Sequence, residues 1–463
     1  MNPDTQDTIV ALATSSGKGA IGIIRLSGSQ AIQIADTIFE GKHPHTLLNA
    51  KANSVHFGTI SYKTEVIDEC LCSVFKSPHS YTGEDSVEIS IHPSVYIENK
   101  IIIALMEQGA RIASCGEFTR RAFLNGKMDL SQAEAVADLI KADSKEAHSM
   151  AFKQLRGEYH NMLLFLSKKL TDLASLLELE LDFSEEDVEF ASRSELVATL
   201  NTIQDKVKEL LDSYEQGNAL KEGYPVSIVG KTNVGKSTLL NVLLGEQRAI
   251  VSSIAGTTTD TIEERLNIEG ITFRFIDTAG IRQTKNSIEQ EGQRRSFRSM
   301  ELSQAILLME DATTSTLQSI KEDIENIQKS GIDLDHKHLV LVMNKCDKKA
   351  KAIRLTSLKQ YTPVLISAKE KENLDKLKDT LVALARPADM DNSLFLTSQR
   401  HFEALSLLSS ALADAKRDIQ EEKSADLVSI SIRQALQYIG EITGQVTTED
   451  ILSNIFSSFC IGK

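Results

Sequence analysis

The sequence predicts a multi-domain α/β protein in which a small α+β domain precedes a helical region that is interrupted by an α/β domain. Three observations support this: the length of 463 residues, the alternation of apolar runs and helix-length segments in the middle of the chain, and helical periodicity on both sides of it. The predicted domains are residues 1–127, 128–221, 222–385 and 386–463, of which the second and fourth form one discontinuous helical domain.

The composition is that of an ordinary globular protein. Hydrophobic residues make up 41% of the chain and charged residues 25%, and a net charge of −14 excludes a protein coated with positive charge for nucleic-acid binding. The longest apolar run, residues 101–106, is too short to span a bilayer, and the first residues lack the layout of a signal peptide. Five scattered cysteines are typical of reduced thiols, so we expect a cytoplasmic protein with no membrane partner.

The first two domains are predicted from short β-like runs followed by a long helical pattern. The first domain is expected to contain strands at 8–14, 21–26, 55–61 and 87–92 and a helix at 95–108. From residue 128 the periodicity is helical to about residue 214. Ser131, with Glu134 three residues later, indicates a capping box at the start of that region.

The third domain is predicted from apolar strands that alternate with helices. The expected elements are strands at 224–230, 271–277, 305–310, 338–344 and 362–367 and a helix at 236–245. This alternation predicts a parallel α/β sheet. A polar segment at 385–394 is typical of a linker, and residues 395–463 return to helical periodicity.

A phosphate-binding loop is predicted at "GKTNVGKS", residues 230–237, which fits G-x-x-x-x-G-K-[ST] between a strand and a helix. Its glycines let backbone N–H groups close around phosphate oxygens at a helix N-terminus. Lys236 is expected to reach the β and γ phosphates, and the Ser237 hydroxyl is expected to bind Mg²⁺. A chance glycine-rich turn is the alternative.

Three further motifs follow in order, each at the end of a predicted strand: "DTAG" (277–280), "NKCD" (344–347) and "SAK" (367–369). Asp277 can hold the metal through water, and the Gly280 N–H can sense the γ-phosphate. Asp347 offers acceptor oxygens to the N1–H and N2–H₂ donors of guanine, whereas adenine has an acceptor at N1 and no 2-amino group. The four motifs together predict a guanine-nucleotide site.

Hydrolysis requires a group that orients the attacking water. "SSIAGTTTD" at 252–260 is a switch-loop candidate, with Thr258 as the second Mg²⁺ hydroxyl ligand. The residue after "DTAG" is Ile281, where Ras-like proteins carry a glutamine that orients water. Asn233 could supply an oxygen to a monovalent cation near the leaving group. Glu289 is a candidate for orienting water, although its spacing alone favours a solvated helix residue.

With these residues in place, the chain resembles the MnmE (TrmE) family of tRNA modification GTPases. The resemblance extends over the whole chain and is independent of the GTPase motifs. It rests on "DTIVALAT", "GAIGIIRLSG", "SYTGEDSVEISIH", "GEFTRRAFLNGKMDLSQAEAVADLI", "SIAGTTTD", "IGEITGQVTTEDIL" and the closing "FCIGK".

The resemblance implies a folate-binding N-terminal domain that forms a homodimer, a discontinuous helical domain, and an inserted Ras-like P-loop G domain activated by potassium-dependent pairing. It implies a heterotetramer with the FAD-dependent partner MnmG. It also implies addition of an aminomethyl or carboxymethylaminomethyl group to C5 of the wobble uridine of certain tRNAs. The one-carbon unit comes from a tetrahydrofolate derivative, the 5-formyl or 5,10-methylene form.

Site residues are carried over by motif position. The implied folate contacts are Arg25, Glu88, Lys127 and Lys463, the K⁺ ligands are Asn233, Ser252, Ile254 and Thr257, and the Mg²⁺ ligands are Ser237 and Thr258. The implied GTP contacts are Asn233, Val234, Gly235, Lys236, Ser237, Thr238, Ser252, Ser253, Ile254, Ala255, Gly256, Thr257, Thr258, Asp277, Thr278, Ala279, Gly280, Asn344, Lys345, Cys346, Asp347, Ser367, Ala368 and Lys369. Glu289 aligns with the carboxylate that orients water, and Cys460 aligns with a cysteine that the family needs for modification.

The closing "FCIGK" has a thiol four residues from the last one, as in a prenylation signal, but Gly462 and Lys463 do not fit that signal. We expect this tail to fold back onto the N-terminal domain. Three departures from the family pattern stand out: Pro93-Ser94 replace a Gly-Gly pair, Thr259 replaces an arginine, and Ser252 replaces a threonine.

Two other functions remain open from the sequence. One is a regulatory or ribosome-assembly GTPase with no part in group transfer, and such GTPases commonly carry an RNA-binding appendage with a G-x-x-G loop. "GEITG" has three residues between its glycines and does not fit that loop. The other is a folate-dependent aminomethyltransferase with a vestigial GTPase, and the intact nucleotide motifs argue against it.

Overall fold

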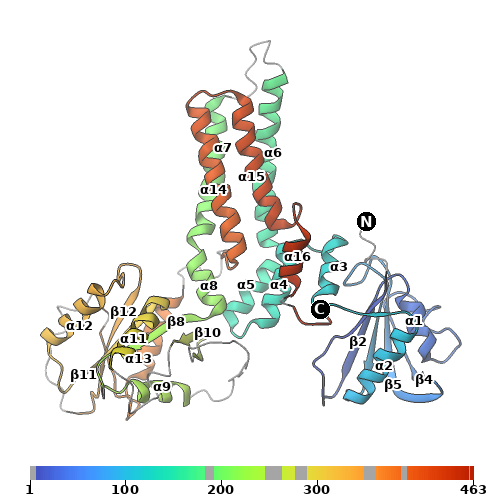
Figure 1. Cartoon of the computed structure of the whole chain (residues 1–463), viewed down its shortest axis with the longest axis horizontal. Coiled ribbons are helices and arrows are strands. Elements are labelled where there is room, and N and C mark those ends of the chain that lie inside the picture. The colour runs from blue at the N-terminus through green and yellow to red at the C-terminus, as the bar shows by residue number, and fades with distance from the viewer. Residues whose placement is uncertain are drawn as a thin grey trace. The chain divides into compact units, whose positions relative to one another are not determined.

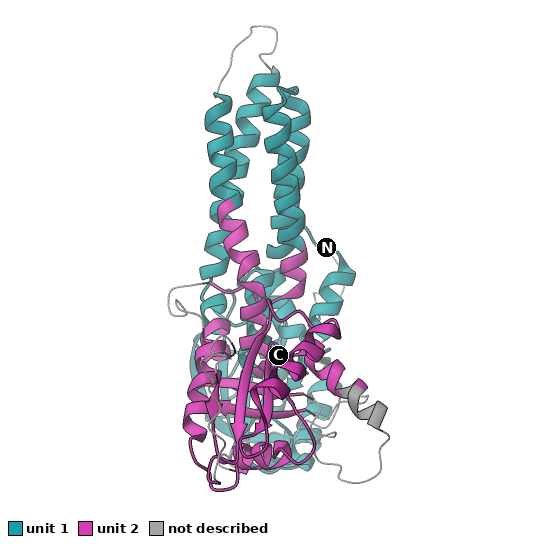
Figure 2. Cartoon of the chain, turned by 90° about the vertical axis from the view of Figure 1, so that its left-hand side faces the viewer, with its two compact units in different colours: residues 1–140, 152–204, 404–463 teal, residues 141–151, 205–403 magenta. Residues whose placement is uncertain are grey.

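The computed structural model describes residues 7–182, 192–245, 263–276, 289–348, 361, 363–386, 394–457 and 459–463, without the side chains of 289–293 and 295. These residues form two compact units, shown in Figure 2. Unit 1 comprises residues 1–140, 152–204 and 404–463, and unit 2 comprises residues 141–151 and 205–403. The domain boundaries predicted from the sequence stay predictions.

Unit 1 contains a seven-stranded sheet of order β3-β4-β5-β6-β2-β1-β7. Its strands are β1 (Ile9–Leu12), β2 (Gly22–Ser27), β3 (Phe39–Glu40), β4 (Ser54–Tyr62), β5 (Glu65–Phe75), β6 (Ser86–Ile91) and β7 (Arg111–Ile112). All neighbours are antiparallel except β1 and β7. Helices α1 (Ala31–Ile38) and α2 (Val95–Glu107) bury their apolar residues against this sheet. Figure 1 shows both helices beside the sheet.

The four strands and the helix predicted for this region are confirmed, each within one or two residues at either end. The longest strand, β5, was not predicted, because its first half is acidic and largely exposed whereas Cys70, Cys72 and Val74 alternate into the core. Pro93 and Ser94, which replace the Gly-Gly pair of the family pattern, both make contacts in the structure. Ser94 caps α2 by accepting a hydrogen bond from the Ile97 amide at 3.2 Å, and Pro93 packs on Gly22.

The helices before and after the α/β segment follow the predicted periodicity. They are α3 (Glu117–Leu124), α4 (Leu130–Lys141), α5 (Lys145–Leu155), α6 (Glu158–Asp182), α7 (Arg193–Asp212), α8 (Tyr214–Glu222), α14 (Gln399–Gln420), α15 (Ala425–Thr443) and α16 (Glu449–Ser457). α6 and α15 lie side by side in Figure 1, joined by an ion pair of 2.6 Å between Glu178 and Arg433. Leu130 and Ala133 share one core with Leu452 and Phe456, so segments far apart in sequence pack together in unit 1.

The predicted capping box at Ser131 is wrong, because the cap is two residues earlier, at Asp129, and the helix begins at Leu130. The Gln132 amide donates to the Asp129 carboxylate at 2.8 Å, and the Asp129 amide donates to the Gln132 side-chain oxygen at 3.0 Å. This reciprocal pair is the capping box, with an aspartate in place of the serine. Ser131 lies inside α4 and donates to Asp129.

Unit 2 contains a six-stranded sheet of order β13-β12-β11-β8-β10-β9. Its strands are β8 (Tyr224–Val229), β9 (Glu264–Ile268), β10 (Ile271–Phe275), β11 (Ala305–Asp311), β12 (His338–Asn344) and β13 (Val364–Leu365), and its helices are α9 (Lys236–Gly245), α11 (Glu289–Leu302), α12 (Leu317–Lys329) and α13 (Leu374–Ala385). β8, β11 and β12 are buried over nearly their whole length. The predicted strands and the helix at 236–245 are therefore confirmed.

The prediction of a wholly parallel sheet is wrong at one edge. β9 pairs antiparallel with β10, whereas the other neighbours are parallel. The turn between them consists of Glu269 and Gly270, both with positive φ, which is the backbone of a two-residue hairpin. Edge strands exposed on one side carry charged residues, and "ERLNI" therefore lacks the apolar run that marked the other strands.

The two ends of the long segment of unit 2 are fastened together. The Tyr214 hydroxyl donates to the Gln399 side chain at 2.6 Å, and the Tyr214 ring lies 4.5 Å from that of Phe402. The Leu396 amide donates to the Ser213 hydroxyl at 3.0 Å. We call this set of contacts the clasp. In the described part of the chain no helix holds an apolar stretch long enough to cross a membrane.

Candidate functional site

The phosphate loop connects the end of β8 to the first residue of α9, as predicted. Gly230 and Gly235 have φ of +141° and +105°. A Cβ on Gly230 would lie 2.3 Å from the Met309 carbonyl oxygen, and a Cβ on Gly235 would lie 2.3 Å from Nδ2 of Asn344. Because both the backbone conformation and the space exclude a side chain, these two positions require glycine.

Lys236 bends back over the loop. Its Nζ donates to the carbonyl oxygens of Gly230 at 2.6 Å and Lys231 at 2.7 Å. Burial lowers the pKa of the Lys236 ammonium from its ordinary value. Lys236, Ser237 and Thr238 open α9, so an ammonium, a hydroxyl and a helix N-terminus meet where the motif predicts a triphosphate with Mg²⁺. These residues fit GTP and Mg²⁺, for which Lys236 would supply charge and Ser237 an oxygen ligand.

Asn344 joins three of the predicted motifs. Its Nδ2 donates to the Val234 carbonyl oxygen at 2.7 Å, and its Oδ1 accepts from the Ala368 amide at 2.9 Å. Asn344 and Val234 are both buried. The side chain therefore fixes the phosphate loop and the "SAK" loop at set positions around one site.

Lys345 makes a second connection to the phosphate loop. It has a φ of +67°, and its Nζ donates to the Asn233 carbonyl oxygen at 2.9 Å and to Oδ2 of Asp311 at 2.6 Å. Although burial acts in the opposite direction, hydrogen bonds from Lys345 and Thr313 lower the pKa of Asp311 to about 2. Asp311, which the sequence did not indicate, thus stays ionised as the anchor of Lys345.

The predicted base-recognition residues also lie together. The Ser367 hydroxyl donates to Oδ1 of Asp347 at 2.6 Å, and this hydrogen bond lowers the pKa of Asp347. The Cys346 amide donates to the Ile366 carbonyl oxygen at 3.1 Å. Lys369 is exposed and pairs with Glu370 at 2.9 Å. An ionised carboxylate held by a serine, next to the phosphate loop, fits recognition of the two guanine donors.

Several predicted residues of this site lie outside the described residues: Ser252, Ser253, Ile254, Ala255, Gly256, Thr257, Thr258, Asp277, Thr278, Ala279 and Gly280. Glu289 begins α11, but its side chain is among those not described. Of the four predicted K⁺ ligands the structure describes Asn233, which is exposed and has a φ of +64°. Of the two predicted Mg²⁺ ligands it describes Ser237.

The implied folate residues of the first sheet lie on neighbouring strands. Arg25 on β2 pairs in register with Glu88 on β6, and their side chains form an ion pair of 2.8 Å. The Arg25 guanidinium lies 5.5 Å from the ring centre of Tyr81 and 5.7 Å from that of Phe118. Burial raises the pKa of Tyr81, whose hydroxyl bonds to Thr119. A partly exposed Arg–Glu pair between two aromatic rings fits a flat, polar ring system.

The other two implied folate residues lie in the turn after α3 and in the tail. Lys127 Nζ donates to the Pro78 carbonyl oxygen at 2.9 Å. The tail pairs with the first sheet region through a β-bridge of Ile461 with Cys115, which confirms that it folds back. A Cβ on Gly462 would lie 2.2 Å from the Leu12 carbonyl oxygen, and Leu12 directly follows the register partner of Arg25. Lys463 thus ends beside β1.

The thiol that the resemblance singles out lies within this tail contact. Cys460 is exposed, and its carbonyl oxygen accepts from the Gly116 amide at 3.4 Å. Two residues later, Gly462 packs so closely against Leu12 of β1 that a side chain would not fit there. The structure therefore brings Cys460 next to the domain that holds Arg25 and Glu88.

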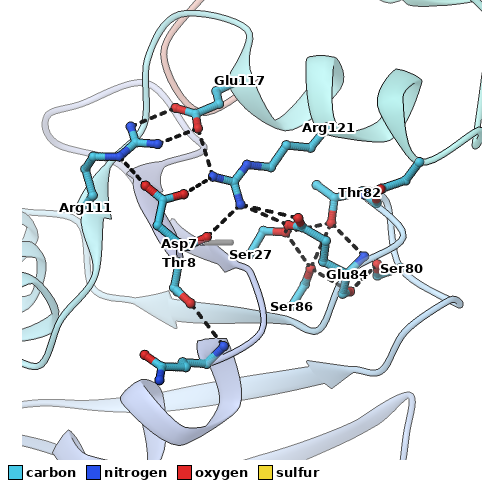
Figure 3. A network of polar contacts seen from close by, with 12 residues as sticks. Asp7, Thr8, Ser27, Ser80, Thr82, Glu84, Ser86, Arg111, Glu117 and Arg121 are labelled. Atoms are coloured by element: carbon cyan, nitrogen blue, oxygen red, sulfur yellow. Dashed lines mark hydrogen bonds and ion pairs between the residues drawn. The ribbon is translucent and has the colours of Figure 1, made fainter. Parts of the chain in front are cut away.

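A network of charged side chains, drawn in Figure 3, supports this region. Arg121 on α3 is 3% exposed and contacts Asp7 at 2.6 Å, Glu117 at 3.0 Å and Glu84 at 3.3 Å. Arg111 contacts Asp7 and Glu117 at 2.6 and 2.7 Å. The network joins the residues just before β1 and the strand β7 to the loop before β6, which carries Tyr81, and to α3, which carries Phe118.

Sequence reasoning missed Tyr81, Phe118 and Arg121. All three lie in strings that carry the family resemblance, but no spacing or charge pattern of their own marked them. These residues come together only in the folded domain, where α3 packs on the sheet, so no local sequence pattern marks them.

Comparison with known proteins shows what the chain resembles. It matches the families described as "GTP-binding protein TrmE N-terminus" over residues 8–127 and "MnmE helical domain" over residues 130–460. It is 47% identical over 460 residues to the tRNA modification GTPase MnmE of Flavobacterium psychrophilum, with 99% of each chain covered. It is 47% identical over 468 residues to the protein of the same name from Bacteroides thetaiotaomicron, covering 99% of this chain and all of that one.

A solved structure of Era in complex with MgGDPNP and a segment of 16S ribosomal RNA is 33% identical over 41% of this chain and 66% of that chain, with a TM-score of 0.27. The family matches and the full-length relatives agree with each other and with the motifs around Lys236 and Asn344. The chain belongs to the MnmE (TrmE) family.

Proposed function

We propose that this protein is a potassium-dependent GTPase that works on tRNA with an FAD-dependent partner of the MnmG type in a heterotetramer. Together they add an aminomethyl or carboxymethylaminomethyl group to C5 of the wobble uridine. The carbon unit comes from 5-formyl- or 5,10-methylene-tetrahydrofolate, and the reaction takes place in the cytoplasm.

The observation that carries this proposal is the position of the tail. A regulatory GTPase gives no reason for the closing segment to bridge Cys115 and to pack on Leu12 of β1, the strand that pairs with the strand carrying Arg25. A folate site explains it, because Arg25, Glu88, Lys127 and Lys463 supply two kinds of charge around a partly exposed aromatic surface. When bound, the folate supplies the one-carbon unit, and the chain's own residues hold and orient it.

The nucleotide site supports the GTPase part of the proposal. Lys236 supplies a positive charge, and Ser367 keeps Asp347 ionised for guanine. Asn233, exposed at the edge of the phosphate loop, has an oxygen to offer to K⁺, together with Ser252, Ile254 and Thr257. Glu289 at the start of α11 is the proposed carboxylate for orienting water.

Homodimerisation through the first domain is supported by an apolar face on β4 and β5. Phe57 is 65% exposed and lies opposite Leu71, which is 45% exposed. Val55, two residues before Phe57 on the same face of β4, is 61% exposed. A monomer rarely exposes three large apolar side chains side by side on a sheet, so we propose that a second copy covers them.

Reconstitution tests the proposal. The purified chain is mixed with the MnmG-type partner, FAD, GTP, Mg²⁺, K⁺, 5,10-methylenetetrahydrofolate, glycine or ammonium, and unmodified tRNA. Digested tRNA is then analysed by mass spectrometry. We expect a wobble uridine heavier by the aminomethyl or carboxymethylaminomethyl group, and no such product without the chain. GTP turnover with unmodified tRNA under all conditions would instead identify a regulatory GTPase.

A further inference from the structure

A buried carboxyl group lies directly behind the phosphate loop. Glu310 is the next-to-last residue of β11, and none of it is exposed to solvent. Its Oε2 accepts a hydrogen bond from the Ser315 hydroxyl at 2.5 Å, whereas its Oε1 is buried with no donor facing it. A buried carboxylate normally has a donor for each oxygen, so this environment favours the neutral acid.

The nearby group is a second carboxyl group, Asp323, rather than a hydrogen-bond donor. Oδ2 of Asp323 on α12 forms an ion pair of 2.6 Å with Nζ of Lys231, and this carboxylate is near enough to Glu310 to affect its ionisation. Burial raises the pKa of Glu310 most; the hydrogen bond from Ser315 acts in the opposite direction, and Asp323 raises the pKa further. The same ion pair raises the pKa of Lys231. These contacts are all satisfied if Glu310 is protonated and Asp323 is ionised. Neutral Glu310 then donates its proton to Asp323, and the Asp323 carboxylate pairs with Lys231.

This group is connected to the phosphate-binding lysine by short contacts. The Lys231 carbonyl oxygen accepts from Nζ of Lys236 at 2.7 Å. Gly230 presses so closely on Met309, the residue before Glu310, that a Cβ there would lie 2.3 Å from the Met309 carbonyl oxygen. The backbone of the loop therefore lies directly against β11 next to the point where Lys231 is held.

We propose that Glu310 is a proton-carrying positioning residue for GTP binding: in its neutral form it holds Asp323, Asp323 holds Lys231, and Lys231 holds the start of the phosphate loop against β11. Loss of the proton places two carboxylates in contact, which turns Asp323 away and loosens Lys231. Glu310 does not touch the nucleotide in this scheme. It acts through the position of Lys236.

The charged groups around Glu310 determine the sign of the pH dependence. Asp323 and Glu322 on α12 are acidic, and the Lys231 ammonium offsets their charge. Asp311, the neighbour on β11, is turned to Lys345 and Thr313. GTP brings further negative charge to the loop, so the complex holds the Glu310 proton more tightly than the free protein does. GTP affinity therefore falls as the pH rises, by at most tenfold per pH unit for one proton.

Glu310→Gln tests the proposal, because a glutamine copies the neutral acid and cannot lose a proton. Binding of a fluorescent GTP analogue with Mg²⁺ is measured from pH 5.5 to 9, and proton uptake is measured by calorimetry in two buffers of different ionisation enthalpy. We expect the parent to take up protons and to lose affinity with rising pH. The variant should keep the parent's low-pH affinity throughout and take up fewer protons.

Glu325→Gln is the matched control, since Glu325 is an exposed residue of α12 paired with Lys329 at 3.1 Å. It should reproduce the parent's profile. Equal pH slopes and equal proton uptake in the parent and in Glu310→Gln would overturn the proposal.

Asp323→Asn gives a second test that does not depend on the folding of Glu310→Gln. An amide raises the pKa of Glu310 less than a carboxylate does and binds Lys231 more weakly. Affinity should fall at every pH, and the pH-dependent step should move to lower pH. A profile that superimposes on that of the parent would contradict the role of Asp323.

Discussion

The side-chain amide of Asn344 donates to the carbonyl oxygen of Val234 at 2.7 Å, although the two residues lie 110 positions apart in the sequence. The other end of the same amide accepts from Ala368. Asn344→Ala would leave a buried carbonyl and a buried N–H unpaired, which costs about 2–4 kcal/mol for the two groups. We expect a lower unfolding temperature for unit 2 and weaker GTP binding, measured by calorimetry and by titration. Asn326→Ala, at an exposed helix position, should change neither.

Asp347→Asn should change the base preference. The amide replaces one acceptor oxygen by a donor that repels the guanine donors, so GTP affinity should fall by about 2–3 kcal/mol. Xanthosine triphosphate, which has a carbonyl in place of the 2-amino group, should bind the variant better than the parent. Competition between the two nucleotides measures both effects. An unchanged preference for GTP would show that Asp347 does not contact the base.

K⁺ should accelerate GTP turnover far more than Na⁺. The K⁺ site that we propose around Asn233 favours the larger ion, which would offset charge on the leaving group where Ile281 stands in place of the glutamine of Ras-like proteins. The difference should be on the order of 100-fold, as for other single groups that stabilise transition-state charge. Asn233→Ala should remove it, and Glu289→Ala should slow turnover at unchanged nucleotide affinity. Equal parent rates in both salts would contradict the assignment.

Removal of residues 461–463 should separate the two activities. The deletion removes the contacts of Ile461 with Cys115 and of Gly462 with Leu12, and with them Lys463, one of the proposed folate contacts. Binding of 5-formyltetrahydrofolate should weaken and wobble-uridine modification should stop, while K⁺-stimulated GTP turnover persists. Cys460→Ser should stop modification with folate binding intact. Full modification by either variant would refute the role of the deleted or changed residue.

Phe57→Asp should shift the protein from dimer to monomer. A charge on the apolar face formed with Val55 and Leu71 disfavours burial against a second copy. Light scattering after size exclusion measures the mass. Gln33→Asp serves as the control, because it adds the same charge at an exposed position of α1, which packs on the opposite face of the sheet, against Cys70 and Cys72. A dimer that survives Phe57→Asp would place the interface elsewhere.

The fold could be predicted from the sequence where apolar residues run together. β8, β11 and β12 are buried on both faces, so their strings stand out in the sequence. β5 and β9 were missed because strands with an exposed face mix charged and apolar residues, and a short mixed string is also compatible with a loop. The cap at Asp129 was misplaced by two residues since Ser131 and Glu134 have the same spacing as Asp129 and Gln132.

The nucleotide site was predictable because its motifs are contiguous and their spacing is fixed by the loop geometry. Gly230 and Gly235 are needed for steric reasons that any phosphate loop shares. The Arg25–Glu88 pair was reached only through the family resemblance, since a cross-strand pair 63 residues apart leaves no local pattern. Glu310 and Asp323 were not predicted at all, because an isolated glutamate in an apolar strand does not reveal its partner.

The clasp makes it possible to replace the α/β segment between residues 214 and 396 by another segment. Tyr214 meets Gln399 and Phe402, and Ser213 meets Leu396, so the chain leaves and rejoins the helices at one point. A segment whose two ends touch can be replaced by a short glycine-serine bridge without stretching its neighbours. The α/β segment thus behaves as a removable cassette, and related cassettes with other nucleotide preferences could be spliced between the same two ends.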